Sequence, residues 1–383
     1  MFVRIDKVDL LSGINMALRA VGTALTQPIL SCLLFEIVDS GVRLTGNNLE
    51  LCVQTAVIPA NPGLDLVEGK VALDAKMLSG LINSFPAGEV TIAVDDKFLA
   101  TIKSGKSEFK IAGQNPENFP NVDSFTPTGS LTIGSKVLKG MVSQTLFCAA
   151  QDTSKMILCG ANIRVTENCI EMCALDGYRV AHSKMEIEYS SEGFSFVIPT
   201  KTLAEMAKLL PANKDIEVTM SFDEGSVWLN FEGAKVFSRL IEGNFPDYDK
   251  LFSGTHTLSI KINRLAFLGG IERANLIGDR KTYVKLEVVD GSMKISSNAQ
   301  TGSMNEELDI ELEGDSVTIG FNPHYIMDAL KAIDNEKVEI DFTGPLTPCV
   351  IRPASESDSK YLVVPVKLQN VETSSSSITA KAA

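Results

Sequence analysis

The sequence predicts an α+β protein built from three copies of one domain, each with two helices and antiparallel sheets. The main observation is a short apolar strand followed by a stop and an amphipathic helix. This pattern occurs three times, at residues 71–86, 196–211 and 317–333. A period this long indicates repeated domains rather than a solenoid, and three domains agree with the chain length of 383 residues.

Two further observations support the repeat. A second helical pattern precedes each copy, at residues 7–21, 135–150 and 263–277. The first two copies also end alike, with Phe-Pro-Asn-Val-Asp at 119–123 and Phe-Pro-Asp-Tyr-Asp at 245–249. We therefore expect domains over residues 1–125, 129–252 and 256–368, joined by linkers at 125–129 and 253–255. Residues 369–383 have no periodicity and are expected to form a disordered tail.

The repeated helices carry recognisable start and stop signals. In the middle copy we expect Thr200 to be the N-cap, because apolar residues follow at helical spacing and Pro211 ends the pattern. Asp74 is the expected cap in the first copy. In the third copy Asn322 is the expected cap and Pro323 occupies the first helical position.

Short strands bounded by turn signals account for the rest of each domain. In the first domain we expect strands at 2–5, 33–38, 41–47, 50–58, 89–94, 97–103 and 107–112. In the second they fall at 161–166, 169–174, 179–188, 216–222, 226–231 and 235–240. In the third they fall at 282–289, 292–297, 306–313, 337–342, 349–353 and 361–368.

Composition is typical of a globular protein, with 44% hydrophobic and 22% charged residues. No apolar run has the length of a membrane span, and the first residues lack a signal-peptide layout. The seven cysteines include no CxxC pair, which favours a reduced, cytoplasmic compartment.

Charge is distributed unevenly. A net charge of −13 argues against nucleic-acid binding, yet the expected helices are net positive. Their basic residues are Lys7, Arg19, Lys76, Lys136, Lys139, Lys201, Lys208, Arg264, Arg273 and Lys331. These residues are either solvated helix faces with pairs such as Lys201–Glu205, or a basic stripe that attracts phosphate.

Recognisable catalytic chemistry is absent from the sequence. There is no P-loop and no GxGxxG after a strand, and the three histidines share no ligand spacing with cysteines or carboxylates. Asp247 and Asp249 have an echo at the end of the first repeat, so we expect a structural role for them. We predict no catalytic residue, no metal site and no cofactor.

Several stretches together resemble the bacterial DNA polymerase III β subunits, the DNA sliding clamps. They are LDGYRV at 175–180, EGNFPDY at 242–248, FNPHY at 321–325, YLVVPVKL at 361–368 and ILCG at 157–160. The resemblance implies a non-catalytic processivity factor of three clamp-fold domains. It also implies a head-to-tail homodimer that closes into a ring around duplex DNA, with the helices lining the channel.

The resemblance also implies site residues. A hydrophobic pocket between domains 2 and 3 is expected to bind peptides of the replicative DNA polymerase, the clamp loader, other polymerases and repair proteins. In this sequence the positions of that pocket correspond to Leu158, Leu175, Gly177, Tyr178, Arg179, Val180, Pro246, Leu346, Val364, Pro365 and Val366. Gln151 joins the basic helix residues as a DNA contact. The implied dimer interface places Phe109 and Ile111 against Leu276 and Ile277 of the partner.

The sequence departs from the family pattern at the pocket. Tyr178 stands where the family usually has His, Leu175 replaces Thr, and Val364 and Val366 replace frequent Met residues. Lys367 stands where Arg is common, and the loop at 23–27 lacks an Arg that some members have. Two other classes stay open from the residues alone: a hydrolase that uses an interdomain cleft, and a self-assembling structural protein.

Overall fold

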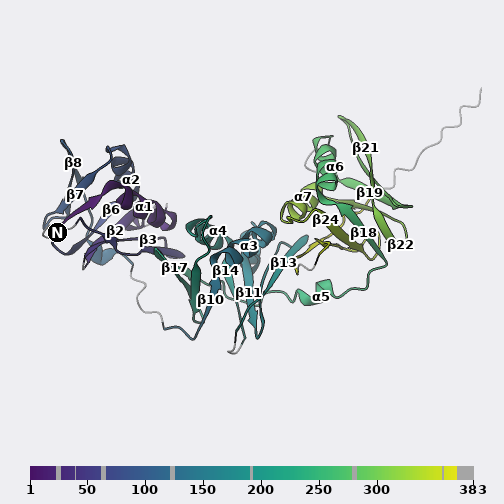
Figure 1. Ribbon diagram of the computed structural model, residues 1–383, viewed down its shortest axis with the longest axis horizontal. Coiled ribbons are helices and arrows are strands. Elements are labelled where there is room, and N and C mark those ends of the chain that lie inside the picture. Colours follow the sequence, from purple (N-terminus) through teal and green to yellow (C-terminus); the bar gives the residue numbers. More distant parts are fainter. Residues whose placement is uncertain are drawn as a thin grey trace, which may run out of the picture. The chain divides into compact units, whose positions relative to one another are not determined.

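The computed structural model describes the chain over eight stretches. They are residues 1–22, 27–38, 40–61, 66–120, 126–189, 193–277, 283–355 and 358–368. The loop at 23–26, the end of the first domain at 121–125 and the expected tail at 369–383 lie outside the described residues. The chain forms two compact units, one of residues 1–174 with 184–245 and one of residues 175–183 with 246 onward (Figure 1).

The first unit contains the elements of two domain repeats. Its helices are α1 (Lys7–Ala17), α2 (Ala75–Ser84), α3 (Ser135–Thr145) and α4 (Thr200–Leu209). The strands of the first repeat are β1 (Phe2–Asp6), β2 (Cys32–Val38), β3 (Gly41–Asn47), β4 (Leu51–Thr55), β5 (Ile58–Pro59), β6 (Gly69–Asp74), β7 (Glu89–Val94), β8 (Leu99–Ser104) and β9 (Ser107–Ala112). Those of the second are β10 (Gly129–Gly134), β11 (Gly160–Thr166), β12 (Cys169–Leu175), β14 (Phe194–Pro199), β15 (Glu217–Phe222), β16 (Ser226–Phe231) and β17 (Ala234–Arg239).

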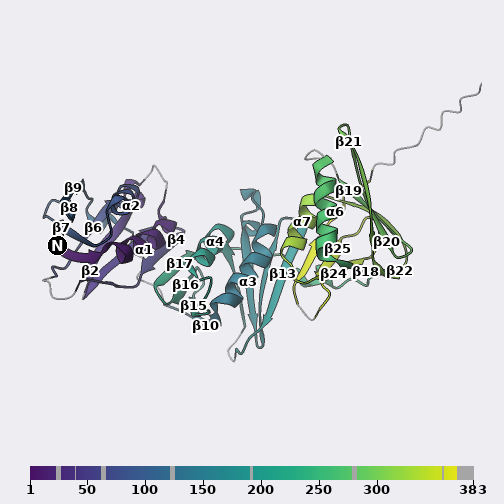
Figure 2. The same cartoon turned by 45° about the horizontal axis from the view of Figure 1, so that its top comes forward.

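Antiparallel pairing joins the two repeats of the first unit. One sheet has the order β1-β7-β8-β9, and a larger one runs β10-β15-β16-β17-β4-β3-β2-β6. The junction is the pairing of β17 with β4, where Val236 lies opposite Val53 and Phe237 opposite Cys52. Because β4 comes from the first repeat and β17 from the second, the two domains share one continuous sheet (Figure 2).

The second unit contains the third repeat. Its helices are α5 (Asp249–Phe252), α6 (Arg264–Ile277) and α7 (Pro323–Lys331). Its strands are β13 (Arg179–Glu186, from its first half), β18 (Leu258–Asn263), β19 (Val284–Val289), β20 (Ser292–Ala299), β21 (Gly302–Asp309), β22 (Glu311–Gly314), β23 (Val317–Phe321), β24 (Lys337–Phe342), β25 (Cys349–Pro353) and β26 (Lys360–Val363). They pair in the orders β13-β26-β25-β24-β18-β22 and β21-β20-β19-β23.

The strand–helix pattern recurs in all three repeats, as the sequence predicts. A strand also leads directly into the first helix at β1–α1, β10–α3 and β18–α6, although β10 and β18 are not among the predicted strands. A strand leads to the second helix at β6–α2, β14–α4 and β23–α7. The α+β class with antiparallel sheets is therefore confirmed. The short helix α5, which precedes the third repeat, is not predicted.

Two of the three predicted helix caps are confirmed. Asp74 accepts a hydrogen bond from the backbone N–H of Met77 at 2.7 Å, and Asn322 accepts from His324 at 3.0 Å. The prediction for Thr200 is wrong, because this residue is inside α4 and Pro199 is its N-cap. The Thr200 hydroxyl instead donates to the carbonyl of Cys159 at 2.8 Å, which ties the helix start to the 3-10 segment Thr153–Cys159 that precedes β11.

Each helix pair packs its apolar face onto the sheets. In the first domain, Leu10 and Ile14 of α1 and Leu78 and Ile82 of α2 are fully buried in one cluster with strand residues such as Phe35. Burial of each such side chain stabilises the fold by roughly 1.5–3 kcal/mol. The helices therefore depend on the sheets beneath them, since helices of this length are marginal alone.

In each helix pair, a cation of the first helix caps the C-terminal end of the second. Lys7 donates from Nζ to the carbonyls of Asn83 and Phe85 at the end of α2. Lys139 of α3 donates to the carbonyl of Leu210, just past α4, at 3.1 Å. Arg264 of α6 donates to the carbonyl of Leu330 at 3.2 Å. These carbonyls have no partner within their helices, so the cations satisfy them and complement the helix dipole.

Three strand predictions are wrong in their extent. The expected strands at 50–58 and 306–313 are each interrupted and divided between two strands, and the one at 361–368 ends early. In the second case the chain moves from β21 to β22, which belong to different sheets, and Ile310 between them donates to the carbonyl of Gly291. In the third, β26 ends at Val363, because Pro365 has no N–H to continue the ladder.

Replacement of Lys139 by Met tests the helix caps. The change removes a partly buried charged hydrogen bond, and we expect the free energy of unfolding to fall by about 1–3 kcal/mol. Lys136→Met on the same helix is the control, because Lys136 is exposed and has no ion pair among the described residues; it should change stability by less than about 0.5 kcal/mol. Equal urea midpoints for the two variants would refute the capping role.

Candidate functional site

Most of the predicted peptide-site residues lie in the second unit. Ten of the eleven belong to residues 175–183 or to the chain from Pro246 onward, and Leu158 lies buried in the first unit. The strand β13 carries Arg179 and Val180 opposite Val363 and Leu362 of β26. Leu346 and Pro246 are exposed, and Leu175 is buried.

The turn before β13 is held by Asp176. One carboxylate oxygen of Asp176 accepts hydrogen bonds from the backbone N–H groups of Tyr178, at 2.8 Å, and Arg179, at 3.1 Å. Gly177 between them has φ +94°, a left-handed conformation that favours glycine. This turn leaves Tyr178 with 62% of its surface exposed.

Arg179 is fixed by two carboxylates and a ring. Its guanidinium donates to Asp176 at 3.1 Å and to Asp328 of α7 at 2.6 Å. It also lies 4.6 Å from the ring centroid of Tyr325, which is itself stacked on Tyr178 at 6.4 Å. The predicted site residues omit Tyr325 and Asp328, although their spacing of three residues places them on one face of α7.

The C-terminal segment follows β26 along this site. The backbone N–H of Val364 donates to the carbonyl of Tyr178 at 2.9 Å, and that of Val366 to Gly320 at the edge strand β23 at 2.8 Å. Leu368 packs over Gly320, where a Cβ would come within 2.5 Å of its side chain. The predicted residues Val364, Pro365 and Val366 therefore lie against the Tyr178 turn at one end and β23 at the other.

Some of the basic residues predicted to face DNA already bind carbonyls or carboxylates of this chain, and others do not. Lys7, Lys139 and Arg264 cap helices, as described above. Four others form ion pairs: Arg19 and Lys208 with Glu205, Arg273 with Glu306, and Lys331 with Glu272. The hydrogen bond from Arg273 lowers the pKa of the Glu306 carboxyl, because it stabilises the carboxylate form. Lys76, Lys136 and Lys201 are exposed and have no ion pair within the described part of the chain.

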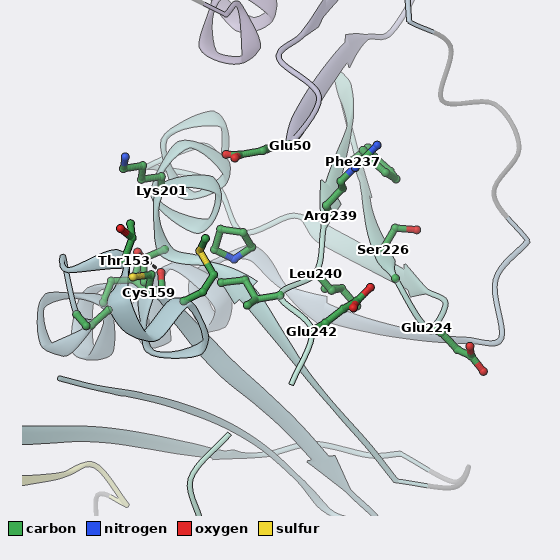
Figure 3. A pocket seen from close by; sticks show the side chains of 18 of the residues that line it. Glu50, Thr153, Cys159, Lys201, Glu224, Ser226, Phe237, Arg239, Leu240 and Glu242 are labelled. Carbon is green, nitrogen blue, oxygen red and sulfur yellow. Dashed lines mark hydrogen bonds between the residues drawn. The ribbon is translucent and has the colours of Figure 1, made fainter. Parts of the chain in front are cut away.

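A cavity of about 1540 Å³ opens in the first unit (Figure 3). Gln151 and Lys201, both predicted DNA contacts, line it together with apolar residues such as Leu240. Glu50 and Glu242 also line it (Figure 3), so positive and negative groups share its wall. No sequence pattern predicts this cavity, because its residues come from segments far apart in the chain.

The predicted interface residues lie near two sheet edges. In the first unit β9 is an edge strand; its Phe109 is 45% exposed and packs on Phe85, whereas Ile111 belongs to the domain core. In the second unit β21 is an edge strand. Leu276, near the end of α6, is 83% exposed, and Ile277 follows it with partial burial.

No group of three or more His, Cys, Asp or Glu residues in the described chain could hold a metal ion. Within the same residues, no helix has the length and apolar character of a membrane span. All seven cysteines are free thiols.

Comparison with known proteins identifies the family. Three models of the DNA polymerase III beta subunit match in order: the N-terminal domain at residues 1–123, the central domain at 132–247 and the C-terminal domain at 250–367. A beta sliding clamp of Staphylococcus aureus is 30% identical over 365 residues, which cover 93% of this chain and 97% of that protein.

Solved structures agree with this match. A putative DNA polymerase III beta subunit from Eubacterium rectale has a TM-score of 0.92 and 31% identity. The DNA polymerase sliding clamp of Bacillus subtilis has a TM-score of 0.91 and 29% identity. Each covers 96% of this chain and 100% of the solved chain.

The fold and the matched domains together define a DNA sliding clamp, a replication protein with no catalytic activity of its own. The chain belongs to the bacterial DNA polymerase III beta subunit family. This outcome confirms the resemblance and excludes the hydrolase and the purely structural protein as its function.

Substitution of Gly177 by Ala tests the turn that presents Tyr178. Alanine is strained at φ +94°, so we expect the free energy of unfolding to fall by about 1–2 kcal/mol. Gly140→Ala is the matched control: apart from its chain neighbours and the nearby backbone of α3, no atom lies within 4 Å of the added Cβ, and alanine inside α3 should stabilise by about 0.5–1 kcal/mol. Thermal or urea unfolding of the two variants should therefore shift in opposite directions. Shifts of the same sign would contradict the assignment.

Proposed function

We propose that two copies of this chain close head to tail into a ring that encircles duplex DNA without sequence preference. The observation that carries the proposal is the pair of unpaired sheet edges, β9 in the first unit and β21 in the second. An edge strand presents free N–H and C=O groups that pair readily with another strand. When two different surfaces of a chain meet in a second copy, the assembly closes if the rotation allows it.

Apolar residues beside these edges support the same interface. Phe109 on β9 and Leu276 on α6 are exposed in the single chain. Isolated exposed apolar residues are normal on a protein surface, but here they lie beside edge strands that lack a neighbour. Ile277 adds a partly buried apolar side chain next to Leu276. Ile111 contributes from the core side of β9 and stabilises the strand itself.

We further propose that the ring holds DNA by topology rather than by affinity. The chain has a net charge of −13, and seven of its ten candidate helix cations are used by carbonyls or carboxylates. Lys76, Lys136 and Lys201 remain for phosphate, with Gln151 as a neutral contact. Few phosphates are then neutralised per protomer, so binding to open duplex is weak and falls with salt.

The segment from Asp176 to Val180 together with Val364–Val366 is our proposed docking site for partner peptides. An extended peptide would lie on apolar side chains here and tether the replicative DNA polymerase, the clamp loader, other polymerases or repair proteins. We place the protein in the cytoplasm, where bacterial DNA is replicated and where free thiols persist.

Replacement of Leu276 and Ile277 by Asp tests the interface. The charged side chains cannot be buried against an apolar edge, so the variant should elute as a folded monomer while the wild type is a dimer at micromolar concentration. Leu251→Asp, an exposed apolar residue on α5, is the control and should leave the dimer intact. Light scattering coupled to gel filtration reports the mass. A monomeric wild type would refute the ring.

Retention on DNA tests encirclement. The loaded wild type should stay on a nicked circular duplex and dissociate once the circle is linearised. Reversal of Lys76, Lys136 and Lys201 to Glu should reduce loading several-fold, because phosphate now meets negative charge. Reversal of Lys97, Lys235 and Lys294, three exposed lysines outside the helices, makes the same change in net charge and should load normally. Equal retention on linear and circular DNA would exclude a closed ring.

A further inference from the structure

The docking site has an aromatic surface at the Asp176 turn. Tyr178 is 62% exposed, although its ring is stacked on Tyr325 with an interplanar angle of 24°. The Tyr178 backbone is held on both sides: Asp176 accepts from the Tyr178 N–H, and the Tyr178 carbonyl accepts from the N–H of Val364. Tyr178 is thus a large, pre-organised ring surface that the described chain leaves open to solvent.

The second ring is fixed by Arg179. The Arg179 side chain is only 13% exposed, and its guanidinium lies 4.6 Å from the Tyr325 centroid while Asp176 and Asp328 accept its hydrogen bonds. A guanidinium held by two carboxylates is in no position to bind a peptide carboxylate. We therefore treat Arg179 as part of the wall. Asp328 is a positioning residue, because it acts on the rings through Arg179.

The group formed by Arg179, Asp176 and Asp328 has a net negative charge. Two carboxylates surround one guanidinium, which leaves one negative charge in excess, and the Asp328 side chain is 41% exposed. An acidic side chain brought to this surface would be repelled, whereas a neutral or cationic one would not. The face of a tyrosine ring likewise attracts cations and stacks with other planar groups.

We propose that the Tyr178–Tyr325 pair is a platform for one planar, non-acidic side chain of the partner peptide, an aromatic ring or an arginine guanidinium. The inference rests on the proposed docking site and names the chemistry that this site selects. It also assigns a consequence to residue 178, where this sequence departs from the expected pattern: Tyr178 offers a large, uncharged ring. A branched aliphatic side chain at the same peptide position gains area but no stacking.

The test begins with peptides chosen by the protein itself. Heptapeptides selected from a random phage-displayed library on the full chain should share a planar residue at one position. Replacement of that residue by Leu in a synthetic peptide should weaken binding about three- to tenfold, the range expected for stacking on one ring. On Tyr178→Leu the same replacement should change affinity less than twofold, and Tyr178→Phe should restore the full difference. Fluorescence anisotropy measures each Kd.

A second arm tests the charge of the group. Peptides with Gln or Glu at the planar position have the same shape, so their difference reports charge alone. On the wild type the Glu peptide should bind at least threefold more weakly than the Gln peptide. On Asp328→Asn this difference should shrink. If Glu binds as tightly as Gln on the wild type, the proposed charge preference is wrong.

Two outcomes separate this inference from the docking site itself. Truncation after Val364 removes Pro365 and Val366 and should abolish binding of the selected peptides. If binding survives this truncation, the proposed docking site is wrong and the platform is excluded with it. The other outcome is that truncation abolishes binding, while the affinity loss on replacing the planar residue by Leu differs less than twofold between the wild type and Tyr178→Leu. In that case the docking site stands and only the platform is overturned.

Discussion

The pairing of β17 with β4 is the interaction on which the first unit depends. Five residue pairs connect strands from different domain repeats, and main-chain bonds beside them, such as Ala56 to Gly233, extend the junction. A shared ladder leaves little freedom between two domains, unlike a linker. The Arg19–Glu205 ion pair, 186 residues apart in sequence, then links a helix end of the first repeat to a helix of the second.

The sequence predicts the helices better than the ends of the strands. Helix caps such as Asp74 and Asn322 are local signals, because the cap bonds an N–H two or three residues away. Thr200 carries the same signal and fails, because it is already the first helical residue of α4, after the N-cap Pro199, and its hydroxyl donates to the carbonyl of Cys159. The break at Ile310 is not visible in the sequence either, since it depends on which sheet each side can join.

The candidate site shows the same difference between local signals, which the sequence contains, and long-range contacts, which it does not. Residues 175–180 and 364–366 are predicted from the family resemblance. Their separation in the chain does not indicate that the two segments touch each other. Tyr325 and Asp328 were missed as site residues because their partner, Arg179, lies 149 residues away from Asp328. Such a pairing becomes visible only when α7 is placed beside β13. Likewise, no sequence pattern separates Lys139, which caps a helix, from the exposed Lys136.

The helices have less free positive charge than their composition indicates, because most of their cations are paired. A net positive set of helices predicts a basic surface, yet carbonyls and carboxylates use most of these cations. Such pairing agrees with the proposed sliding ring, because each additional free cation would add a phosphate contact and strengthen binding to DNA. The cation at the Tyr178 turn is paired as well, because the Arg179 guanidinium donates to Asp176 and Asp328. At the proposed docking site, affinity would then come from ring surface and apolar area, and the net negative charge of the Arg179 group would disfavour acidic peptides.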